Sequence, residues 1–448
     1  MRVALLQPET PGTQGWCPPL GLAYLAAALE SSHEVRIYDL NATPFSDEGL
    51  RREISPASVD VVGITSTMAS HKEALRLARL FEGCRVVFGG PQASARPGPY
   101  LDVPGAVVLR GEAERTFPAY VTELEQGRPG AGIPGLAFRS GLGVEIHNPL
   151  PPLVGDLDTL PLPARHLLDM SAYAVQLQGR KGTNIMSSRG CPFSCIFCYH
   201  DYLGKAYRTR SPRSVVDEIE FLASTYDVGA ILFYDDNFTL KRQRVLAICD
   251  LLLARHLDVV WRCYARVDGV DRELLTRMRE AGCVEIVFGV ESGSQRTLDL
   301  ARKGITVEES LKAIRLCHEA GIATKSYLMI GFPWETKADI EQTLALMEEL
   351  LPSQVHVVIV VAFPGTPLER MLREQGTDID EDVDITGIAQ PSFETAAFTK
   401  QDLLRYRDLA YERIRSANVA HVLSYDWHQD PDWSRQFKAP RGPDGERP

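Results

Sequence analysis

The sequence contains no long apolar run. No segment reaches the roughly 20 consecutive apolar residues that a bilayer-spanning helix needs. The opening MRVALLQPETPG has neither the apolar core nor the small-residue cleavage site of a secretion signal. With 448 residues, 44% of them hydrophobic, the chain is long enough for two or three domains with buried cores. We therefore expect a cytoplasmic protein without a membrane partner.

An excess of positive charge is also missing. The 59 acidic residues outnumber the 48 lysines and arginines, which gives a net charge of −11. This balance argues against a broad electrostatic attraction to nucleic acid or to an anionic membrane surface. The expected partner is a small-molecule substrate, and no nucleic acid is expected.

The nine cysteines are an odd number in a chain without a secretion signal, which favours reduced thiols over a disulfide framework. Three of them, Cys191, Cys195 and Cys198, lie within eight residues. We expect the scattered ones to be small buried residues. These are Cys17, Cys84, Cys249, Cys263, Cys283 and Cys317.

The first part of the chain alternates short β-rich runs with amphipathic helical stretches, which is typical of a parallel sheet covered on both faces. The expected strands are 2–8, 34–40, 59–65, 84–90 and 105–111. This α/β pattern predicts a flavodoxin-like doubly wound domain over residues 1–132. A hairpin and a proline-rich linker are expected over 133–183.

A second β/α series begins near Asn184. Its six expected strands are 184–189, 230–236, 259–265, 284–290, 325–332 and 355–363. Six strand–helix units in succession predict a partial, TIM-like (β/α)6 barrel over 184–375. The remainder, 376–448, is expected to be a short C-terminal region with a disordered tail from about Lys438.

The three clustered cysteines carry the strongest chemical signal. They lie in SSRGCPFSCIFCYH (187–200), with C-x3-C-x2-C spacing, on a loop directly after the first barrel strand. Active sites of β/α barrels are built at that end of the strands. Thiolates bind iron–sulfur clusters, and three of them leave one iron of a four-iron cluster open. The alternative is a structural zinc site with His200 as fourth ligand, although closed zinc sites usually show two ligand pairs.

The same segment resembles the signature of the radical S-adenosylmethionine (SAM) superfamily, including an aromatic residue, Phe197, before the last cysteine. The resemblance implies that the open iron of a 4Fe-4S cluster binds the amino and carboxylate groups of SAM. One electron then cleaves SAM to methionine and a 5′-deoxyadenosyl radical, which abstracts hydrogen from unactivated carbon. It also implies an electron donor such as flavodoxin or ferredoxin.

Phrases at the ends of later strands resemble the SAM-binding segments of the same superfamily. The residues implied to contact SAM are Tyr234, Asp235, Asp236 and Asn237 after the second strand, Arg266 after the third, Glu291 and Ser292 after the fourth, and Gly331 after the fifth. A solvated acidic turn is the alternative for the first group. Helix capping is the alternative to a cofactor role for Glu335.

The first domain resembles the cobalamin-binding module that precedes the barrel in many of these enzymes. The matching phrases are PPLGLAYLAAAL, FGGPQAS and LRGEAERTF, which imply corrinoid contacts at Gly89, Gly90 and Glu112. The Asp-x-His-x-x-Gly phrase that supplies a cobalt-binding histidine in cobalamin mutases is missing. Its candidate position, DLNATP at 39–44, excludes histidine ligation at that loop. A flavodoxin-like domain without a ligand stays an alternative.

These patterns lead to three hypotheses. The first is a cobalamin-dependent radical SAM enzyme that methylates carbon in a small metabolite. The second is radical deoxygenation, dehydration, epimerisation or cyclisation of an aminoglycoside-like sugar or another natural-product intermediate without cobalamin, which the short C-terminal region favours. The third, a non-catalytic metal protein, does not explain why all six barrel strands end in polar or glycine-rich phrases.

Overall fold

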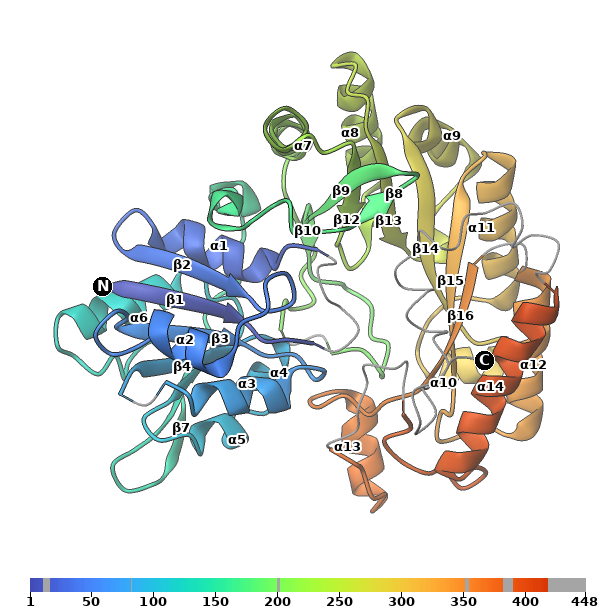
Figure 1. Ribbon diagram of the computed structural model, residues 1–448. Coiled ribbons are helices and arrows are strands. Elements are labelled where there is room, and N and C mark those ends of the chain that lie inside the picture. Colours follow the sequence, from blue (N-terminus) through green and yellow to red (C-terminus); the bar gives the residue numbers. More distant parts are fainter. Residues whose placement is uncertain (11–16, 82, 200–201, 351–353, 382–389, 418–448) are drawn as a thin grey trace, which may run out of the picture.

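The computed structural model describes residues 1–10, 17–81, 83–199, 202–350, 354–381 and 390–417. Figure 1 shows two α/β lobes, an N-terminal one in blue and a curled one that runs from green to red. Within these described stretches, no helix combines the length and the apolar character that crossing a membrane requires.

The first lobe is built on a seven-stranded sheet with the order β2-β1-β3-β4-β5-β6-β7. The strands are β1 (Arg2–Gln7), β2 (Glu34–Asp39), β3 (Val61–Thr65), β4 (Arg85–Gly89), β5 (Val107–Leu109), β6 (Leu136–Arg139) and β7 (Glu145–His147). The first five strands are parallel, and their 2-1-3-4-5 order is that of flavodoxin-like folds, which confirms the predicted class. β6 and β7 form the predicted hairpin, and β6 pairs antiparallel with β5, so the hairpin extends the first sheet.

Helices cover both faces of this sheet. They are α1 (Leu20–Leu29), α2 (Asp47–Glu53), α3 (His71–Ala78), α4 (Pro91–Ala95), α5 (Gly98–Leu101) and α6 (Thr116–Glu125). Along β1, Val3 and Leu5 face the core under α1 and α6, whereas Ala4 and Leu6 face the core under α3. Because strand side chains alternate between the two faces, a strand buried on both sides is apolar throughout.

The connection between the lobes is tied to the first one. It contains the 3-10 turns η1 (Leu157–Thr159) and η2 (Arg165–Leu167). The Ala164 amide donates to the Ala23 carbonyl at 3.0 Å, and the Tyr173 hydroxyl donates to Asp39 at 2.9 Å. The first lobe therefore anchors the chain before it enters the second sheet.

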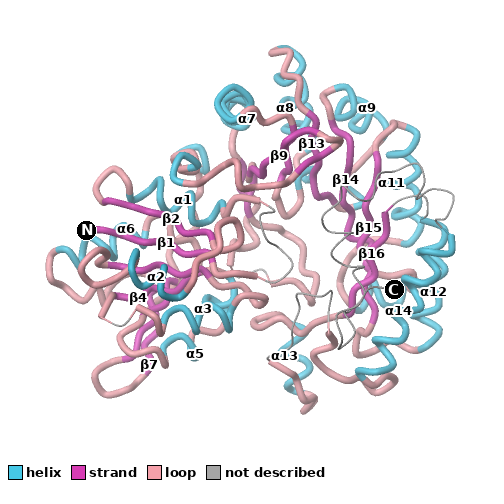
Figure 2. The backbone as a smooth tube through the Cα atoms, in the orientation of Figure 1, coloured by secondary structure: helices cyan, strands magenta, loops and turns pink. Residues whose placement is uncertain are grey.

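The second sheet has the order β16-β15-β14-β13-β12-β9-β8. Its strands are β8 (Gln176–Leu177), β9 (Arg180–Ile185), β12 (Ala230–Phe233), β13 (Val260–Ala265), β14 (Cys283–Glu291), β15 (Ala323–Ile330) and β16 (Gln354–Ile359). In this sheet β9 and β12 to β16 are parallel, and only β8 runs antiparallel to its neighbour. Figure 2 shows the curled but open sheet, which confirms the partial barrel. The first barrel strand lies slightly earlier than the expected 184–189, since β9 ends at Ile185.

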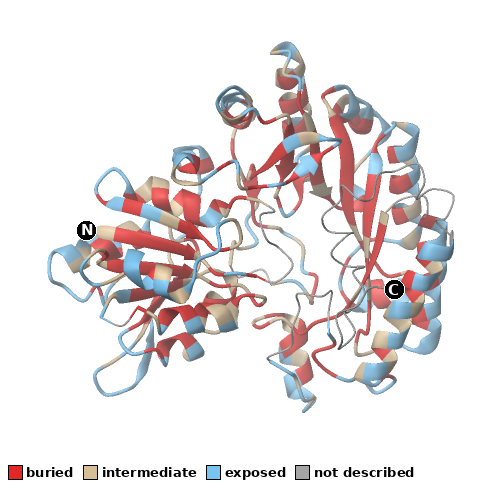
Figure 3. Ribbon diagram, viewed as in Figure 1, coloured by how far each residue is buried: buried red, intermediate tan, exposed pale blue. Residues whose placement is uncertain are grey.

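Helices pack on the convex side of this sheet, and the strands between them are buried (Figure 3). They are α7 (Pro212–Tyr226), α8 (Arg242–Ala254), α9 (Arg272–Glu280), α10 (Gln295–Leu300), α11 (Val307–Glu319), α12 (Lys337–Leu350) and α14 (Lys400–Ala417). α13 (Pro367–Glu374) lies apart from them, and its Leu368 and Leu372 pack with Ile196 and Phe332. The turns η3 (Phe238–Leu240) and η4 (Val267–Gly269) follow β12 and β13. Four of the scattered cysteines are buried in this region, whereas Cys17 and Cys84 in the first lobe are only partly buried.

α14 was not predicted from the sequence. This helix packs against β16 and α12, where Leu403 and Ala410 join the barrel core. The Tyr411 hydroxyl also donates to the Val357 carbonyl at 3.1 Å. The expected disordered tail from Lys438 lies outside the described residues.

Candidate active site

A two-stranded ribbon brings together the two ends of the cysteine loop, residues 190–207. β10 (Ser188–Arg189) and β11 (Arg208–Thr209) pair antiparallel, with Arg189 opposite Arg208. Gly190 opens the loop with a φ of 83°, and an added Cβ there would lie 2.5 Å from the Ala206 carbonyl oxygen. Only glycine fits such a turn without displacing backbone.

The three cysteines of this loop lie close enough to influence one another electrostatically. Burial raises the pKa of all three thiols, and for Cys198 burial, Cys195, Asp236 and Cys191 together raise the pKa to about 12. Cys195 is buried and Cys191 is half-buried, while Cys198 keeps an accessible surface. Burial disfavours the free thiolate form of these cysteines, whereas a bound iron ion would stabilise the deprotonated sulfur.

The donor set fits a cluster. In the described parts of the chain, no three His, Cys, Asp or Glu side chains converge on one metal ion. A 4Fe-4S cluster does not require such convergence, because each cysteine binds a different iron atom. His200, the fourth ligand in the zinc alternative, lies outside the described residues.

Arg266, directly after β13, braces the cysteine loop. Its guanidinium lies 3.6 Å from the ring centroid of Phe193, between the first two cysteines. It is held by two 3.0 Å contacts with Asp268 and donates to the Lys303 carbonyl at 2.8 Å. Its charge opposes the rise that burial causes in the pKa values of the nearest cysteines. The predicted SAM contact of Arg266 stays a prediction.

Glu291, at the end of β14, pairs with a lysine that the sequence analysis missed. Its Oε1 lies 2.7 Å from Lys303 Nζ, and both side chains are buried. Both groups also act on Cys195, whose pKa Lys303 lowers and Glu291 raises against the larger effect of burial. Glu291 has a φ of 69°, which is rare for a residue with a side chain and typical of functional sites.

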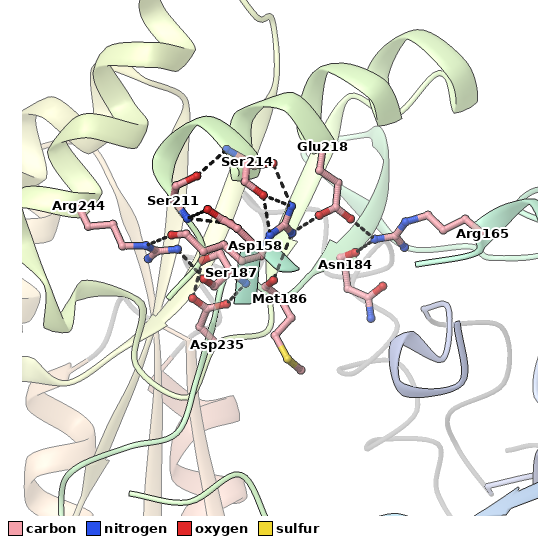
Figure 4. A network of polar contacts seen from close by, with 11 residues as sticks. Asp158, Arg165, Asn184, Met186, Ser187, Ser211, Ser214, Glu218, Asp235 and Arg244 are labelled. Carbon is pink, nitrogen blue, oxygen red and sulfur yellow. Dashed lines mark hydrogen bonds and ion pairs between the residues drawn. The ribbon is translucent and has the colours of Figure 1, made fainter. Parts of the chain in front are cut away.

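The acidic segment after β12 also holds the cysteine loop. Asp235 is buried and accepts hydrogen bonds from the Ser187 amide at 2.7 Å and from the Ser187 and Ser188 hydroxyls at 2.6 Å each. Figure 4 shows it beside Ser187 and the guanidinium of Arg244. Asp236 accepts from the Gly190 amide at 3.0 Å. These contacts explain the acidic pair structurally, and its predicted SAM contacts stay predictions.

Two neighbours of this pair were also predicted to bind SAM. The Asn237 carbonyl accepts from the Tyr207 hydroxyl at 3.0 Å, which fixes the end of the cysteine loop. Tyr234 donates to Cys17 Sγ at 3.5 Å, a contact between the two lobes. Burial raises the pKa of Tyr234 well above its ordinary value, so this hydroxyl stays protonated.

The fourth and fifth strand ends meet in a buried polar turn. Ser292 is fully buried, 3.0 Å from the Thr343 hydroxyl. Glu335 accepts from the Gly331 and Phe332 amides at 2.7 and 3.0 Å, so it holds the turn after β15 and does not cap α12, which begins at Lys337. Gly331 has a φ of 94°, and a Cβ there would lie 3.0 Å from Leu403 of α14. These contacts do not bear on SAM binding, so the SAM contacts of Ser292 and Gly331 stay predictions.

Phe197 connects this turn to the cysteine loop. Its ring lies 5.7 Å from that of Phe332 in an edge-to-face arrangement. Ile196 next to it belongs to the same apolar cluster. The structure therefore brings the ends of β12, β13, β14 and β15 to the cysteine loop, as the barrel prediction requires.

A cavity of about 270 Å³ lies at the carboxyl edge of the first sheet. The predicted Gly89, Gly90 and Glu112 all line it, together with α1 and α6. Gly90 has a φ of 90°, and a Cβ there would meet the Ser66 carbonyl oxygen at 2.6 Å, so this wall of the cavity requires glycine. The loop 39–44 does not line the cavity.

The second lobe completes this cavity with Met186 and Arg189 before the cysteines and Tyr202 and Leu203 after them. The lining is largely apolar, with few charged groups on one side, as in most ligand sites. A planar ligand with polar substituents fits this wall, and it would touch the cysteine loop. The residues thus fit a corrinoid that is shared between the lobes.

Comparisons with known proteins agree with this geometry. A model of the radical SAM superfamily matches residues 185–347, and a model of the B12 binding domain matches residues 13–121. An uncharacterized methyltransferase, PH0819 of Pyrococcus horikoshii, is 34% identical over 386 residues, which are 82% of each chain. The anaerobic magnesium-protoporphyrin IX monomethyl ester cyclase of Rubrivivax gelatinosus is 29% identical over 397 residues, 84% of this chain and 70% of that one.

Among solved structures, the cobalamin-dependent SAM radical enzyme OxsB, with aqua-cobalamin and SAM bound, superimposes with a TM-score of 0.76. The match covers 92% of this chain and 66% of OxsB, at 17% sequence identity. At that identity the likeness shows the shared fold.

The fold and the cysteine loop define an iron–sulfur enzyme whose barrel follows a flavodoxin-like domain. The chain belongs to the radical SAM superfamily, in the group that carries a B12 binding domain before the barrel. A 4Fe-4S cluster and SAM are accordingly its cofactors, and the first lobe is the cobalamin-binding domain.

Proposed function

We propose that this enzyme uses cobalamin and SAM to methylate a carbon atom of a small molecule. The observation that carries the proposal is the cavity at the edge of the first sheet, because residues from both lobes line it. A corrinoid bound there would face the cysteine loop. The relatives named as methyltransferases support the same reaction type.

When bound, the cluster supplies the electron that cleaves SAM, and the corrinoid carries the methyl group. The chain positions these groups. Cys191, Cys195 and Cys198 would hold three irons, and Arg266 and the Glu291–Lys303 pair keep the loop in place beside them. We propose that Asp236 and the neighbouring ends of β12 to β15 line the SAM site.

The remaining partners follow from this chemistry. A reduced cluster needs a one-electron donor, for which we propose a flavodoxin or a ferredoxin. Free thiols and a reducible cluster suit the reducing cytoplasm, where we place the enzyme.

Anaerobic reconstitution tests the proposal. The protein is loaded with iron, sulfide and hydroxocobalamin, desalted, and incubated with SAM and dithionite. We expect about one corrinoid per chain in the visible spectrum, together with 5′-deoxyadenosine and S-adenosylhomocysteine among the products. The second product reports methyl transfer from SAM.

The alternatives give different results. 5′-Deoxyadenosine without bound corrinoid and without S-adenosylhomocysteine would support radical chemistry alone, such as deoxygenation or ring formation without cobalamin. Failure to cleave SAM at all, in protein with a full iron content, would contradict the assignment of the cysteine loop. A Cys195→Ala variant serves as the control that lacks a cluster ligand.

A further inference from the structure

Four charged side chains meet where the first lobe touches the base of the cysteine loop. Glu112 and Glu114 follow β5, while Arg189 and Arg208 stand opposite each other on the β10–β11 ribbon. None of these side chains is more than 9% exposed. We call this group the Glu112 cluster.

One carboxylate of the first lobe holds both strands of the ribbon. Glu112 Oε1 lies 3.0 Å from Arg189 Nη1 and 2.8 Å from Arg208 Nη1. Glu112 Oε2 accepts from Arg208 at 2.8 Å and from the Val154 amide at 2.8 Å. Arg189 and Arg208 flank the cysteine loop on its two sides, so Glu112 fixes both ends of the loop from the other lobe.

Further contacts carry this restraint into the loop. Arg208 Nη2 donates to the Leu203 carbonyl at 2.6 Å, and Leu203 lines the cavity. Arg189 Nη2 reaches Glu114 at 2.6 Å, and its guanidinium lies 5.3 Å from the ring centroid of Tyr24 in α1. The cavity wall and the loop base are therefore one connected set of side chains.

The burial of these charges makes the connection stiff. Separating the partners of a buried ion pair is energetically costly, because it leaves an uncompensated charge out of contact with water. Glu112, Glu114 and Arg189 also line the cavity directly. A ligand that orders the cavity wall therefore orders the cysteine loop, and a cluster that orders the loop orders the wall.

We propose that Glu112 is a positioning residue that couples the cavity of the first lobe to the cysteine loop, so that corrinoid binding and cluster binding strengthen each other. The coupling rests on the proposed function, since it takes the corrinoid as the occupant of the cavity. By thermodynamic linkage, the effect is equal in both directions.

Equilibrium dialysis of hydroxocobalamin measures the coupling without any turnover. The dissociation constant is determined for cluster-free protein and for protein reconstituted with iron and sulfide, both under anaerobic conditions. We expect reconstitution to tighten binding in the wild type by at least about fivefold, a typical coupling between sites. In Glu112→Gln the ratio of the two constants should fall to about one.

Asp39→Asn is the matched control. Asp39 is a buried carboxyl at the carboxyl end of β2 in the same sheet, and it too bonds outside its sheet, to Tyr173. It has no contact with the ribbon among the bonds of the described residues. This variant loses a buried carboxylate as Glu112→Gln does, yet it should keep the wild-type ratio.

Glu114→Gln provides a second, milder variant, because Glu114 pairs with Arg189 alone in the Glu112 cluster. We expect its ratio to lie between those of the wild type and Glu112→Gln. An unchanged ratio in both glutamine variants, or a ratio of one in the wild type, would overturn the coupling and leave the proposed function intact. A wild type that does not bind hydroxocobalamin at all would overturn the proposed function and the coupling with it.

Discussion

Glu335 shows how a single buried residue sets local chemistry. Its carboxyl group is 1% exposed and accepts two backbone hydrogen bonds from the turn after β15. Burial raises its pKa from 4.5 to about 8, although the two amides oppose the shift. The folded protein therefore holds this proton through the neutral range, whereas the unfolded chain releases it.

This shift predicts a pH-dependent stability. Between pH 4.5 and about 8 the folded state binds more protons than the unfolded state, so the free energy of unfolding falls as the pH rises. The slope from one such group is at most about 1.4 kcal/mol per pH unit. In Glu335→Gln, which keeps the acceptor oxygen, we expect a flatter profile in urea unfolding. The exposed Glu341→Gln should behave as the wild type, and parallel profiles for all three proteins would contradict the role of Glu335.

Gly90 is a residue whose backbone conformation is required by its surroundings. Replacement by alanine places a Cβ 2.6 Å from the Ser66 carbonyl oxygen at a φ of 90°. We expect Gly90→Ala to lower the free energy of unfolding by at least about 1 kcal/mol. Gly21→Ala is the control, because Gly21 lies in α1 with open space around its Cβ. Equal stability of the two variants in urea unfolding would refute this assignment.

Among the secondary-structure elements, α14 packs against β16, the last strand of the partial barrel. Leu403 is 1% exposed and contacts the turn at Gly331, so the helix supports a loop that approaches the cysteines. The docking of α14 depends on contacts between residues that are distant in the sequence. The amphipathic pattern of α14 follows a stretch of acidic and polar residues, and no helix was predicted in this region.

Leu403→Ala tests this packing. We expect the free energy of unfolding to fall by about 2–5 kcal/mol, because a buried leucine leaves a cavity when it is truncated. Arg405→Ala, whose side chain is 72% exposed, should change stability by less than about 1 kcal/mol. Denaturant unfolding of both variants gives the comparison, and a small loss for Leu403→Ala would show that α14 docks weakly.

At the scale of the whole molecule, the cavity between the lobes is the feature that unites the two domains. Gly21 lines it, and nothing lies within 4 Å of a Cβ built there. We expect a larger side chain at this position to extend from the cavity wall with little effect on the fold. A substitution of Gly21 can therefore test ligand binding without a large change in the free energy of unfolding.

Gly21→Leu should weaken hydroxocobalamin binding by tenfold or more, which corresponds to about 1.4 kcal/mol. Its unfolding free energy should stay close to that of Gly21→Ala, the matched small variant, which should bind as the wild type does. Equilibrium dialysis with both variants measures the effect. Unchanged affinity in Gly21→Leu would mean that the corrinoid binds elsewhere.

The two α/β lobes and the cysteine loop could be predicted from the amino-acid sequence alone. Apolar runs of strand length, spaced by amphipathic helices, are local patterns, and parallel strands place their carboxyl ends at one edge. The cysteine spacing is also local, so it could be recognised without any knowledge of the fold. The hairpin over 133–148 was predicted as well, since turn and strand signals are short-range.

The ion pairs between distant residues could not be predicted from the sequence, because they depend on how the folded elements pack. Glu112 lies 77 residues before Arg189 in the chain, and the contact between them depends on how the two lobes dock. The same holds for Glu291 with Lys303 at the cysteine loop and for Leu403 against Gly331. Ion pairs and close packing are set by distances of a few ångströms between separate elements. No local pattern encodes such distances, because the elements reach them only when their hydrophobic faces have packed.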